Sequence, residues 1–255
     1  MKIKFLVLVF VLQMSIIGFA QNSIIEYKDG NQRLSGVSVK PAIKLKNNPG
    51  ILILSAWMGI DDHAKDTATR LAALGYSTFV ADIYGVDQRP KNYSEAGQKA
   101  GYFKKNVKEY QIRIQLALDQ LILHGANPDE IVVIGYCFGG TGAIEAARTN
   151  MKVKGIVSFH GGLSRDENRT IESINPKLLV LHGADDPYVS KIEVENFQNE
   201  MRKAKADWQM IFYADAVHSF TDKNAGTDNS KGAAYNQKAE KRSWEAMLTF
   251  LNEIL

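Results

Sequence analysis

The sequence is poor in cysteine, since Cys137 is the only one among 255 residues. A single thiol cannot form a disulfide within the chain, so the fold must be held together by its core. With 45% hydrophobic and 23% charged residues, a chain of this length can bury such a core in one large domain.

Other absences limit the possible functions. The five histidines show no metal-ligand spacing with carboxylates or with Cys137, so we expect neither a metal nor another cofactor. The net charge of +3 comes without a dense basic cluster, so we expect no nucleic acid partner. The oligomeric state cannot be read from these numbers.

The longest apolar run lies in residues 1–20, which have the pattern of a secretory signal peptide. Two lysines precede the run, and Gly18 and Ala20 are small residues at the positions that a signal peptidase reads. We therefore expect residues 21–255 to be exported, to the periplasm or beyond, with no stable membrane span after cleavage. An uncleaved anchor is the alternative, although the run is short for a span. A lone thiol in an exported protein is a liability unless it is buried or useful.

The rest of the chain alternates between short apolar runs and helical patterns. Strands are predicted at residues 24–27, 34–39, 51–54, 76–81, 131–134, 155–159, 178–181 and 208–213, and helices at 63–74, 107–121, 141–148, 191–204 and 235–254. The first two strands form an antiparallel pair around the turn at residues 29–31. No element is predicted at 91–101, which is polar and without a clear period. The pattern indicates one α/β domain over residues 21–255, with a mostly parallel sheet covered on both faces.

Glycines enclose the cysteine in Gly135-Tyr136-Cys137-Phe138-Gly139, between a buried strand and a helix. This is the pattern G-x-S-x-G, with cysteine in place of serine, of a turn that lifts a nucleophile above a sheet. The turn is so tight that the residues two before and two after the nucleophile must lack bulk. The helix that follows favours a thiolate at its N-terminus.

An acid and a histidine follow the cysteine, each just after a strand. The acid candidate is Asp186, with Asp185 as the second choice, and the histidine candidate is His218. The order nucleophile, acid, histidine is the one used by enzymes with such a turn. The combination predicts a catalytic triad of Cys137, Asp186 and His218, although each residue alone has a structural explanation.

An oxyanion hole requires two backbone N–H groups. One is expected from Phe138, and the other from the loop at residues 55–59, where Gly59 permits an unusual backbone. Trp57 in this loop is a natural wall for a substrate. His160, after the strand at 155–159, either lines the substrate pocket or is structural.

These motifs resemble those of the dienelactone hydrolase family, and the resemblance runs from about Pro49 to the C-terminus. It includes Asp61-Asp62-His63, Gly75-Tyr76, Ala81-Asp82-Ile83-Tyr84-Gly85, Gly135-Tyr136-Cys137-Phe138-Gly139-Gly140, Ser158-Phe159-His160-Gly161-Gly162, His182-Gly183-Ala184-Asp185-Asp186-Pro187, Val217-His218-Ser219-Phe220 and Arg242-Ser243-Trp244-Glu245-Ala246-Met247. The resemblance implies an α/β-hydrolase fold, Cys137, Asp186 and His218 as triad, and Trp57 and Phe138 as oxyanion donors.

Two departures from the family pattern affect the expected chemistry. Members often carry His-Glu where this chain has Ser55-Ala56, and that glutamate contacts the nucleophile. Without it, we expect a more reactive resting thiol. The best-known members also hold a substrate carboxylate with arginines, one of them at the position of Asp222. We therefore expect neutral or apolar acyl groups to be preferred, unless Lys99 or Lys104 supplies a cation.

The sequence thus predicts a cofactor-free hydrolase of small-molecule carboxylic esters or lactones, acting through a covalent acyl-enzyme on Cys137. The alternative is a catalytically silent small-molecule binding protein on the same fold. A peptidase has no support beyond the triad.

Overall fold

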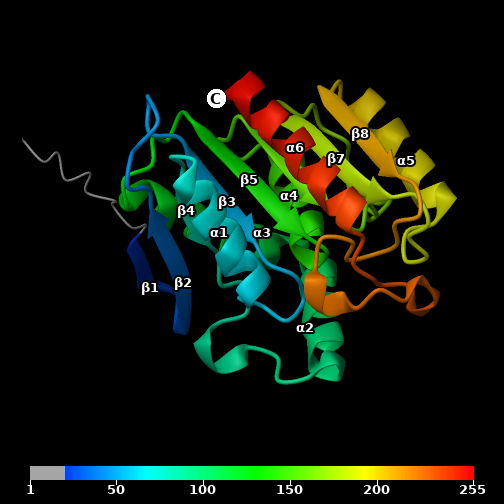
Figure 1. Cartoon of the computed structure of the whole chain (residues 1–255), viewed down its shortest axis with the longest axis horizontal. Helices are drawn as coiled ribbons and strands as arrows, with labels where there is room; N and C mark the ends of the chain where they lie inside the picture. The colour runs from blue at the N-terminus through cyan, green and yellow to red at the C-terminus, as the bar shows by residue number, and fades with distance from the viewer. Residues whose placement is uncertain (1–20) are drawn as a thin grey trace, which may run out of the picture.

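The computed structural model describes residues 21–255, so the predicted signal peptide lies outside the described part of the chain. At its centre is an eight-stranded sheet in the order β1-β2-β4-β3-β5-β6-β7-β8 (Figure 1). The strands are β1 (Gln21–Asp29), β2 (Gln32–Lys40), β3 (Gly50–Leu54), β4 (Ser77–Val80), β5 (Ile131–Tyr136), β6 (Gly155–Phe159), β7 (Lys177–Gly183) and β8 (Trp208–Tyr213). This mostly parallel sheet, with strands and helices alternating along the chain, confirms the predicted fold class.

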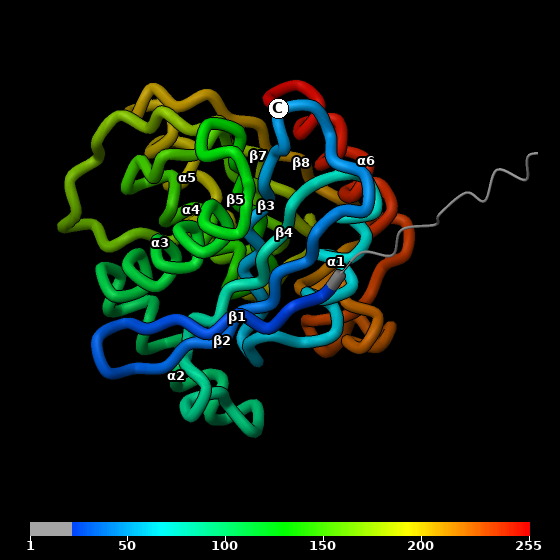
Figure 2. Tube along the Cα trace, turned by 90° about the vertical axis from the view of Figure 1, so that its left-hand side faces the viewer, coloured from blue at the N-terminus to red at the C-terminus, as the bar shows by residue number. Residues whose placement is uncertain are grey.

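β1 and β2 form an antiparallel hairpin, drawn in dark blue in Figure 2. The turn between them contains Gly30, whose φ of 53° is in the left-handed region that glycine adopts easily. β2 also pairs antiparallel with β4. All later pairings, from β4 with β3 to β7 with β8, are parallel. The predicted strand pair around residues 29–31 is therefore confirmed.

Helices cover both faces of the sheet. They are α1 (Asp62–Ala73), α2 (Tyr93–Lys105), α3 (Val107–Leu123), α4 (Phe138–Arg148), α5 (Lys191–Lys203) and α6 (Gln237–Ile254). α1 and α6 lie in front of the sheet in Figure 1, and their Leu71 and Met247 share one buried cluster. α3, α4 and α5 contribute to a second buried cluster on the opposite face. Strands between two such layers are buried on both sides, which is why β3 and β5 are continuous apolar runs.

α2 corrects the expectation for residues 91–101, where no element was predicted. Its N-terminus is capped by the Asn92 side chain, which accepts a hydrogen bond from the Glu95 N–H at 3.0 Å. Its buried residues are Ala96, Ala100 and Phe103, at helical spacing. Two of the three are alanines, so the apolar stripe is too weak to detect in a polar segment. α2 lies at the end of the sheet to which the β5 arrow points (Figure 1).

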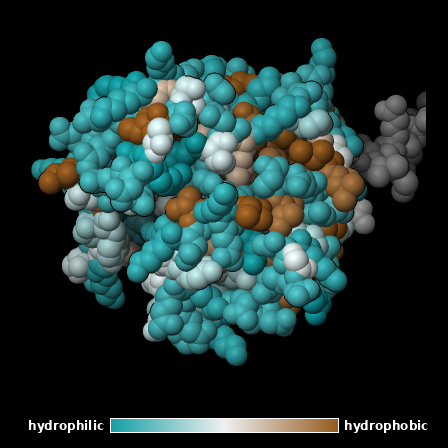
Figure 3. All heavy atoms as spheres, turned by 180° about the vertical axis from the view of Figure 1, so that it is seen from behind, coloured by the Kyte–Doolittle hydropathy of each residue, from teal (hydrophilic) through white to brown (hydrophobic). Residues whose placement is uncertain are grey.

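Within residues 21–255, no helix is both long and apolar enough to cross a bilayer. The face seen from behind is mostly hydrophilic, and its apolar residues gather in small patches (Figure 3). The apolar side chains are instead concentrated in the two clusters on either side of the sheet.

A buried ion-pair network ties α4 and α5 to the long segment between β6 and β7. The Arg148 guanidinium lies 2.7 Å from a carboxylate oxygen of Glu145 and 2.7 Å from one of Glu200. It also donates hydrogen bonds to the carbonyls of Leu163 and Ser164. All three charged side chains are buried. The network therefore fixes where the segment after β6 leaves the sheet.

Replacing Arg148 with alanine should destabilise the protein by about 3–5 kcal/mol, because it leaves buried carboxylates without a principal partner. Urea unfolding measures the loss. Arg202→Ala is the matched control, since Arg202 is an exposed arginine on α5 whose side chain donates to the Asn199 side chain and, within residues 21–255, to no other group. That change should cost no more than about 0.5 kcal/mol. Equal stability of the two variants would contradict a structural role for the network.

Candidate active site

Cys137 occupies a sharp turn between β5 and α4. Its φ of 53° is in the left-handed region, which is uncommon for a residue with a side chain. The turn brings the backbone so close to its neighbours that a Cβ on Gly135 would overlap the Gly139 carbonyl, and one on Gly139 would overlap the Leu54 carbonyl. The requirement for glycine at both positions, predicted from the sequence, is therefore steric. The turn leaves Cys137 half-buried at the carboxyl end of the sheet.

The structure brings Cys137, His218 and Asp186 into one hydrogen-bonded chain. His218 Nε2 lies 3.0 Å from Cys137 Sγ, and His218 Nδ1 lies 2.8 Å from Asp186 Oδ2. The other Asp186 oxygen accepts the Tyr188 N–H at 2.9 Å. Asp186 is buried, whereas the second-choice acid Asp185 is exposed. The geometry therefore selects Asp186 over its neighbour.

These contacts change the pKa values of His218 and Cys137. Burial lowers the pKa of His218, but the Asp186 carboxylate and the Cys137 sulfur more than reverse this and raise the pKa to about 10. Burial raises the pKa of the Cys137 thiol, but His218 and the charge of Lys104 outweigh it, so the pKa lies below its ordinary value. Both shifts favour a thiolate–imidazolium pair at neutral pH.

The two expected oxyanion donors follow two neighbouring parallel strands, Trp57 after β3 and Phe138 after β5. Phe138 is the first residue of α4, so its N–H has no acceptor within the helix. Trp57 is in the loop after β3. Gly59 in this loop has a φ of 85°, the unusual backbone that was expected there because glycine permits it. The Tyr84 hydroxyl donates to the Trp57 carbonyl at 2.8 Å and so holds that peptide in place. The sequence analysis did not find this role of Tyr84.

Two exposed aromatic side chains border the site. The indole of Trp57 stacks on Tyr93 of α2, with ring centroids 5.7 Å apart and planes 8° apart. Tyr188 stands with its ring at 85° to that of His218, at a centroid distance of 5.3 Å. Trp57 was expected as a substrate wall, and its exposed position is compatible with that. Tyr188 was not singled out, although it lies two residues after the predicted acid.

His160 lies behind His218. It is buried, and its ring centroid is 5.3 Å from that of His218. Its Nε2 lies 2.9 Å from the Thr221 hydroxyl oxygen. Of the two expectations for His160, this placement favours a structural role over lining the open side of a pocket.

Of the two candidate lysines, Lys104 is the one beside the cysteine. Its Nζ lies 3.7 Å from the position that a Cβ on Gly162 would take, and its charge favours the thiolate. Lys99 lies elsewhere and donates to the Gln88 side chain at 3.1 Å. Asp222 accepts the Asn224 N–H at 2.8 Å as the cap of a short 3₁₀ helix.

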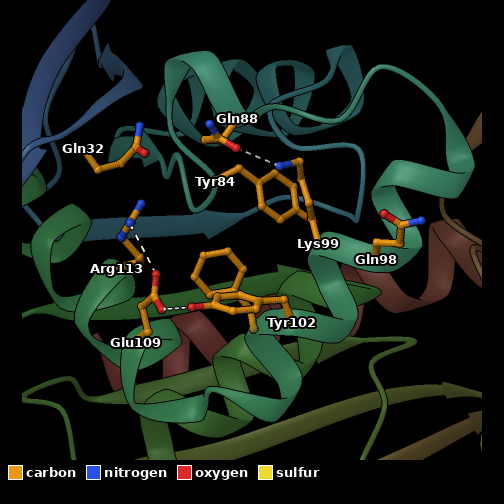
Figure 4. A pocket seen from close by; sticks show the side chains of 9 residues that line it. Gln32, Tyr84, Gln88, Gln98, Lys99, Tyr102, Glu109 and Arg113 are labelled. Carbon is orange, nitrogen blue, oxygen red and sulfur yellow. Dashed lines mark hydrogen bonds and ion pairs between the residues drawn. The ribbon is translucent and has the colours of Figure 1, made fainter.

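Lys99 lines a separate cavity of about 380 Å³, shown in Figure 4. The cavity is lined by Gln32, Tyr84, Gln88, Gln98, Lys99, Tyr102, Phe103, Glu109 and Arg113. Lys99 points toward Gln88 there, and Tyr102 toward Glu109. The triad candidates are absent from this lining. α2 contacts Trp57 through Tyr93, which does not line the cavity.

In the described part of the chain, no group of three or more histidine, cysteine or acidic side chains is arranged to hold a metal ion.

An eight-stranded, mostly parallel sheet with a sharp G-x-C-x-G turn at the end of β5 defines an α/β hydrolase. The chain belongs to the dienelactone hydrolase family, whose sequence pattern matches residues 34–255. The protein is accordingly a hydrolase of ester or lactone bonds.

Solved structures and curated proteins support this assignment. A dienelactone hydrolase-like promiscuous phosphotriesterase from metagenomic libraries is 34% identical, with a TM-score of 0.86 over 93% of this chain and 99% of that one. A structure titled m3DLH is 33% identical, with a TM-score of 0.88 over 93% and 100%. A Yersinia pestis protein named as a carboxymethylenebutenolidase is 24% identical over 80% of this chain and 78% of its own length.

The pH dependence of iodoacetamide alkylation should report the shifted thiol. We expect a midpoint below about 8.5, the ordinary thiol value, because His218 and Lys104 stabilise the thiolate. As the pH falls through that midpoint, the thiolate is protonated and alkylation slows. The control is the same chain in concentrated guanidinium, where its single cysteine should titrate normally. A folded midpoint equal to the unfolded one would contradict the thiolate–imidazolium pair.

Proposed function

We propose that Cys137 is the nucleophile of a thiol-dependent carboxylic ester or lactone hydrolase, with His218 as general base and acid and Asp186 as its orienting partner. The observation that carries this proposal is the unbroken chain of hydrogen bonds from Asp186 through His218 to Cys137 Sγ. The family supports ester and lactone chemistry in general. The assignment of these three residues and of the covalent intermediate is ours.

In the first half-reaction, the Cys137 sulfur attacks the carbonyl carbon of the ester. The carbonyl oxygen becomes an oxyanion, for which the N–H groups of Phe138 and Trp57 are the proposed donors. The tetrahedral intermediate collapses with cleavage of the carbon–oxygen bond of the ester. His218 gives its proton to the departing alkoxide, which leaves as an alcohol, and a thioester on Cys137 remains.

In the second half-reaction, neutral His218 takes a proton from a water molecule, whose oxygen attacks the thioester carbonyl. The second tetrahedral intermediate collapses and releases the carboxylic acid. The sulfur leaves as a thiolate, so the thiolate–imidazolium pair of the resting enzyme is restored. For a lactone, the alcohol and the acid are two ends of one product. No cofactor is required in either half.

The site is suited to small neutral substrates. Trp57 and Tyr93 offer a stacked aromatic surface beside it, and the protein lacks the arginine that the family pattern has at Asp222. We also propose that the N-terminal segment directs the protein out of the cytoplasm, where its lone thiol would serve catalysis.

Cys137→Ala and His218→Ala should each lower kcat/KM on p-nitrophenyl esters by at least about 10³-fold, because triad members act as a unit. Circular dichroism should show that both variants remain folded. Asp186→Asn should be severely impaired, since it orients the wrong tautomer of His218. Asp185→Asn is the matched control and should retain activity, because Asp185 is exposed.

Undiminished activity in the first two variants would contradict the triad. The absence of ester hydrolysis by the wild-type protein itself would favour the alternative, a silent small-molecule binding protein. A larger loss of activity in Asp185→Asn than in Asp186→Asn would show that Asp185, and not Asp186, is the acid of the triad. Mass spectrometry of the enzyme with a slowly hydrolysed ester should detect an acyl group on wild-type protein and none on Cys137→Ala.

A neutral acyl group should be preferred over a carboxylate-bearing one of the same chain length. Moving an anion into a site without a buried partner costs free energy, and an exposed lysine such as Lys104 returns at most about 1 kcal/mol. The measurement compares kcat/KM for the p-nitrophenyl ester of pentanoic acid with that for the mono-ester of glutaric acid. A preference of about tenfold or more for the former is expected. The opposite preference would show that a cation of this site binds the carboxylate.

A further inference from the structure

His160 has two unfavourable features at a position beside the proposed catalytic histidine. Its φ of 39° is in the left-handed region, and its Nδ1 is buried with no hydrogen-bond partner among residues 21–255. Each feature lowers the stability of the folded state. Glycine, the residue type at the next two positions, Gly161 and Gly162, would adopt the backbone conformation of position 160 without strain. The imidazole of His160 must therefore contribute something that a smaller residue would not.

The contacts of His160 point toward His218. The two rings meet at 65° with centroids 5.3 Å apart, and the Phe220 ring stands at 80° on His160 at 5.1 Å. His160 Nε2 lies 2.9 Å from the Thr221 hydroxyl oxygen, which fixes the rotation of the imidazole. Thr221 is itself buried. The His160 ring is thus held from two sides and presents a fixed surface to His218.

The ring plane of His218 depends on such a surface, because His218 belongs to no helix and to no strand of the sheet. It lies in a loop, where its backbone N–H donates to the Gly232 carbonyl and its carbonyl accepts from Ala234. Its ring lies against the rings of buried His160 and exposed Tyr188. In the proposed acyl-enzyme, the sulfur is bonded to carbon and no longer holds Nε2 as a thiolate. The Asp186 contact at Nδ1 then remains, and one hydrogen bond allows the ring to swing about it.

We propose that His160 is a positioning residue that fixes the ring plane of His218 in both half-reactions, and that the Thr221 hydroxyl fixes His160. This inference rests on the proposed function of His218. Burial holds the pKa of His160 well below its ordinary value, so the ring is neutral and does not repel the His218 imidazolium. A neutral polar ring can lie against that cation, whereas a charged one would displace it.

Several titratable groups face this pair of histidines from the surrounding elements. They are Asp186 and Tyr188 from the turn after β7, His182 from β7, Cys137 from the turn before α4, His63 from α1 and, through the sulfur, Lys104 from α2. None of them is replaced in Thr221→Val or His160→Ala. A shift in the thiol titration is then due to the position of His218.

The sharpest test compares Thr221→Val, which is close in shape but lacks the hydroxyl, with Thr221→Ser, which keeps it. Thr221→Val should lower kcat by about tenfold with KM changed less than twofold, because a misplaced base slows the chemistry rather than binding. The alkylation midpoint of Cys137 should rise toward that of an ordinary thiol. Thr221→Ser should keep kcat within about twofold of wild type and leave the alkylation midpoint of Cys137 at its wild-type pH.

His160→Ala and His182→Ala form a second pair. Both histidines are buried, but the ring contact of His182 is with Phe212 rather than with His218. Both variants should lose stability, whereas His160→Ala alone should lower kcat and raise the alkylation midpoint. This separates positioning of His218 from a contribution to folding.

The inference fails if Thr221→Val and His160→Ala alkylate with the wild-type midpoint and keep the wild-type kcat. It also fails if His182→Ala moves the midpoint as much as His160→Ala does. Failure of the proposed function has a different signature, because Cys137→Ala would then retain wild-type ester hydrolysis. The alkylation readout remains valid in that case, since it depends on the thiol and not on turnover.

Discussion

The close approach of backbone at the end of β5 is the constraint on which the site depends. The turn places Cys137 in the left-handed region and allows no Cβ at Gly135 or Gly139. The same turn starts α4, so it supplies the N–H of Phe138 next to the sulfur. Because β5 lies in the middle of the sheet, between β3 and β6, the loops that follow neighbouring strands meet at this point. The fold therefore brings together groups that are far apart in the sequence, such as His218 and Cys137, which are separated by 81 residues.

Electrostatics then determines the resting state of these groups. A buried thiol alone would be protonated, and a buried histidine alone would be neutral, as His160 is. The hydrogen bonds between Cys137, His218 and Asp186 reverse both tendencies. In relatives with a glutamate at the position of Ala56, a second acid stands beside the sulfur. Here the half-buried Ala56 supplies none, and the side chains that lower the pKa of Cys137 against the effect of burial are His218 and Lys104.

The sequence was sufficient for those features that depend on short-range steric rules. Paired glycines around Cys137 predicted the turn, and continuous apolar runs predicted the central strands. α2 was not predicted, because its buried face includes the alanines Ala96 and Ala100, which give little periodic signal. The ion pairs of Arg148 and the contact of Tyr84 with Trp57 were also missed. Arg148 and Glu200 are 52 residues apart and Tyr84 and Trp57 are 27 apart, and no local pattern shows which distant side chains meet.

α2 borders the site from outside the sheet, and the side chains that it buries affect the space beside Trp57. α2 packs mainly against α3 and buries Ala96, Ala100 and Phe103, so it removes less apolar area from water than α3, which buries Tyr110, Ile114 and Leu118. The wall formed by Trp57 and Tyr93 therefore rests partly on a weakly docked element. A small outward shift of α2 would widen the space beside Trp57 while the sheet stays in place, because Tyr93 belongs to α2 and Trp57 to the loop after β3. The width of that space therefore depends on the packing of one helix, independently of the residues proposed for the chemistry.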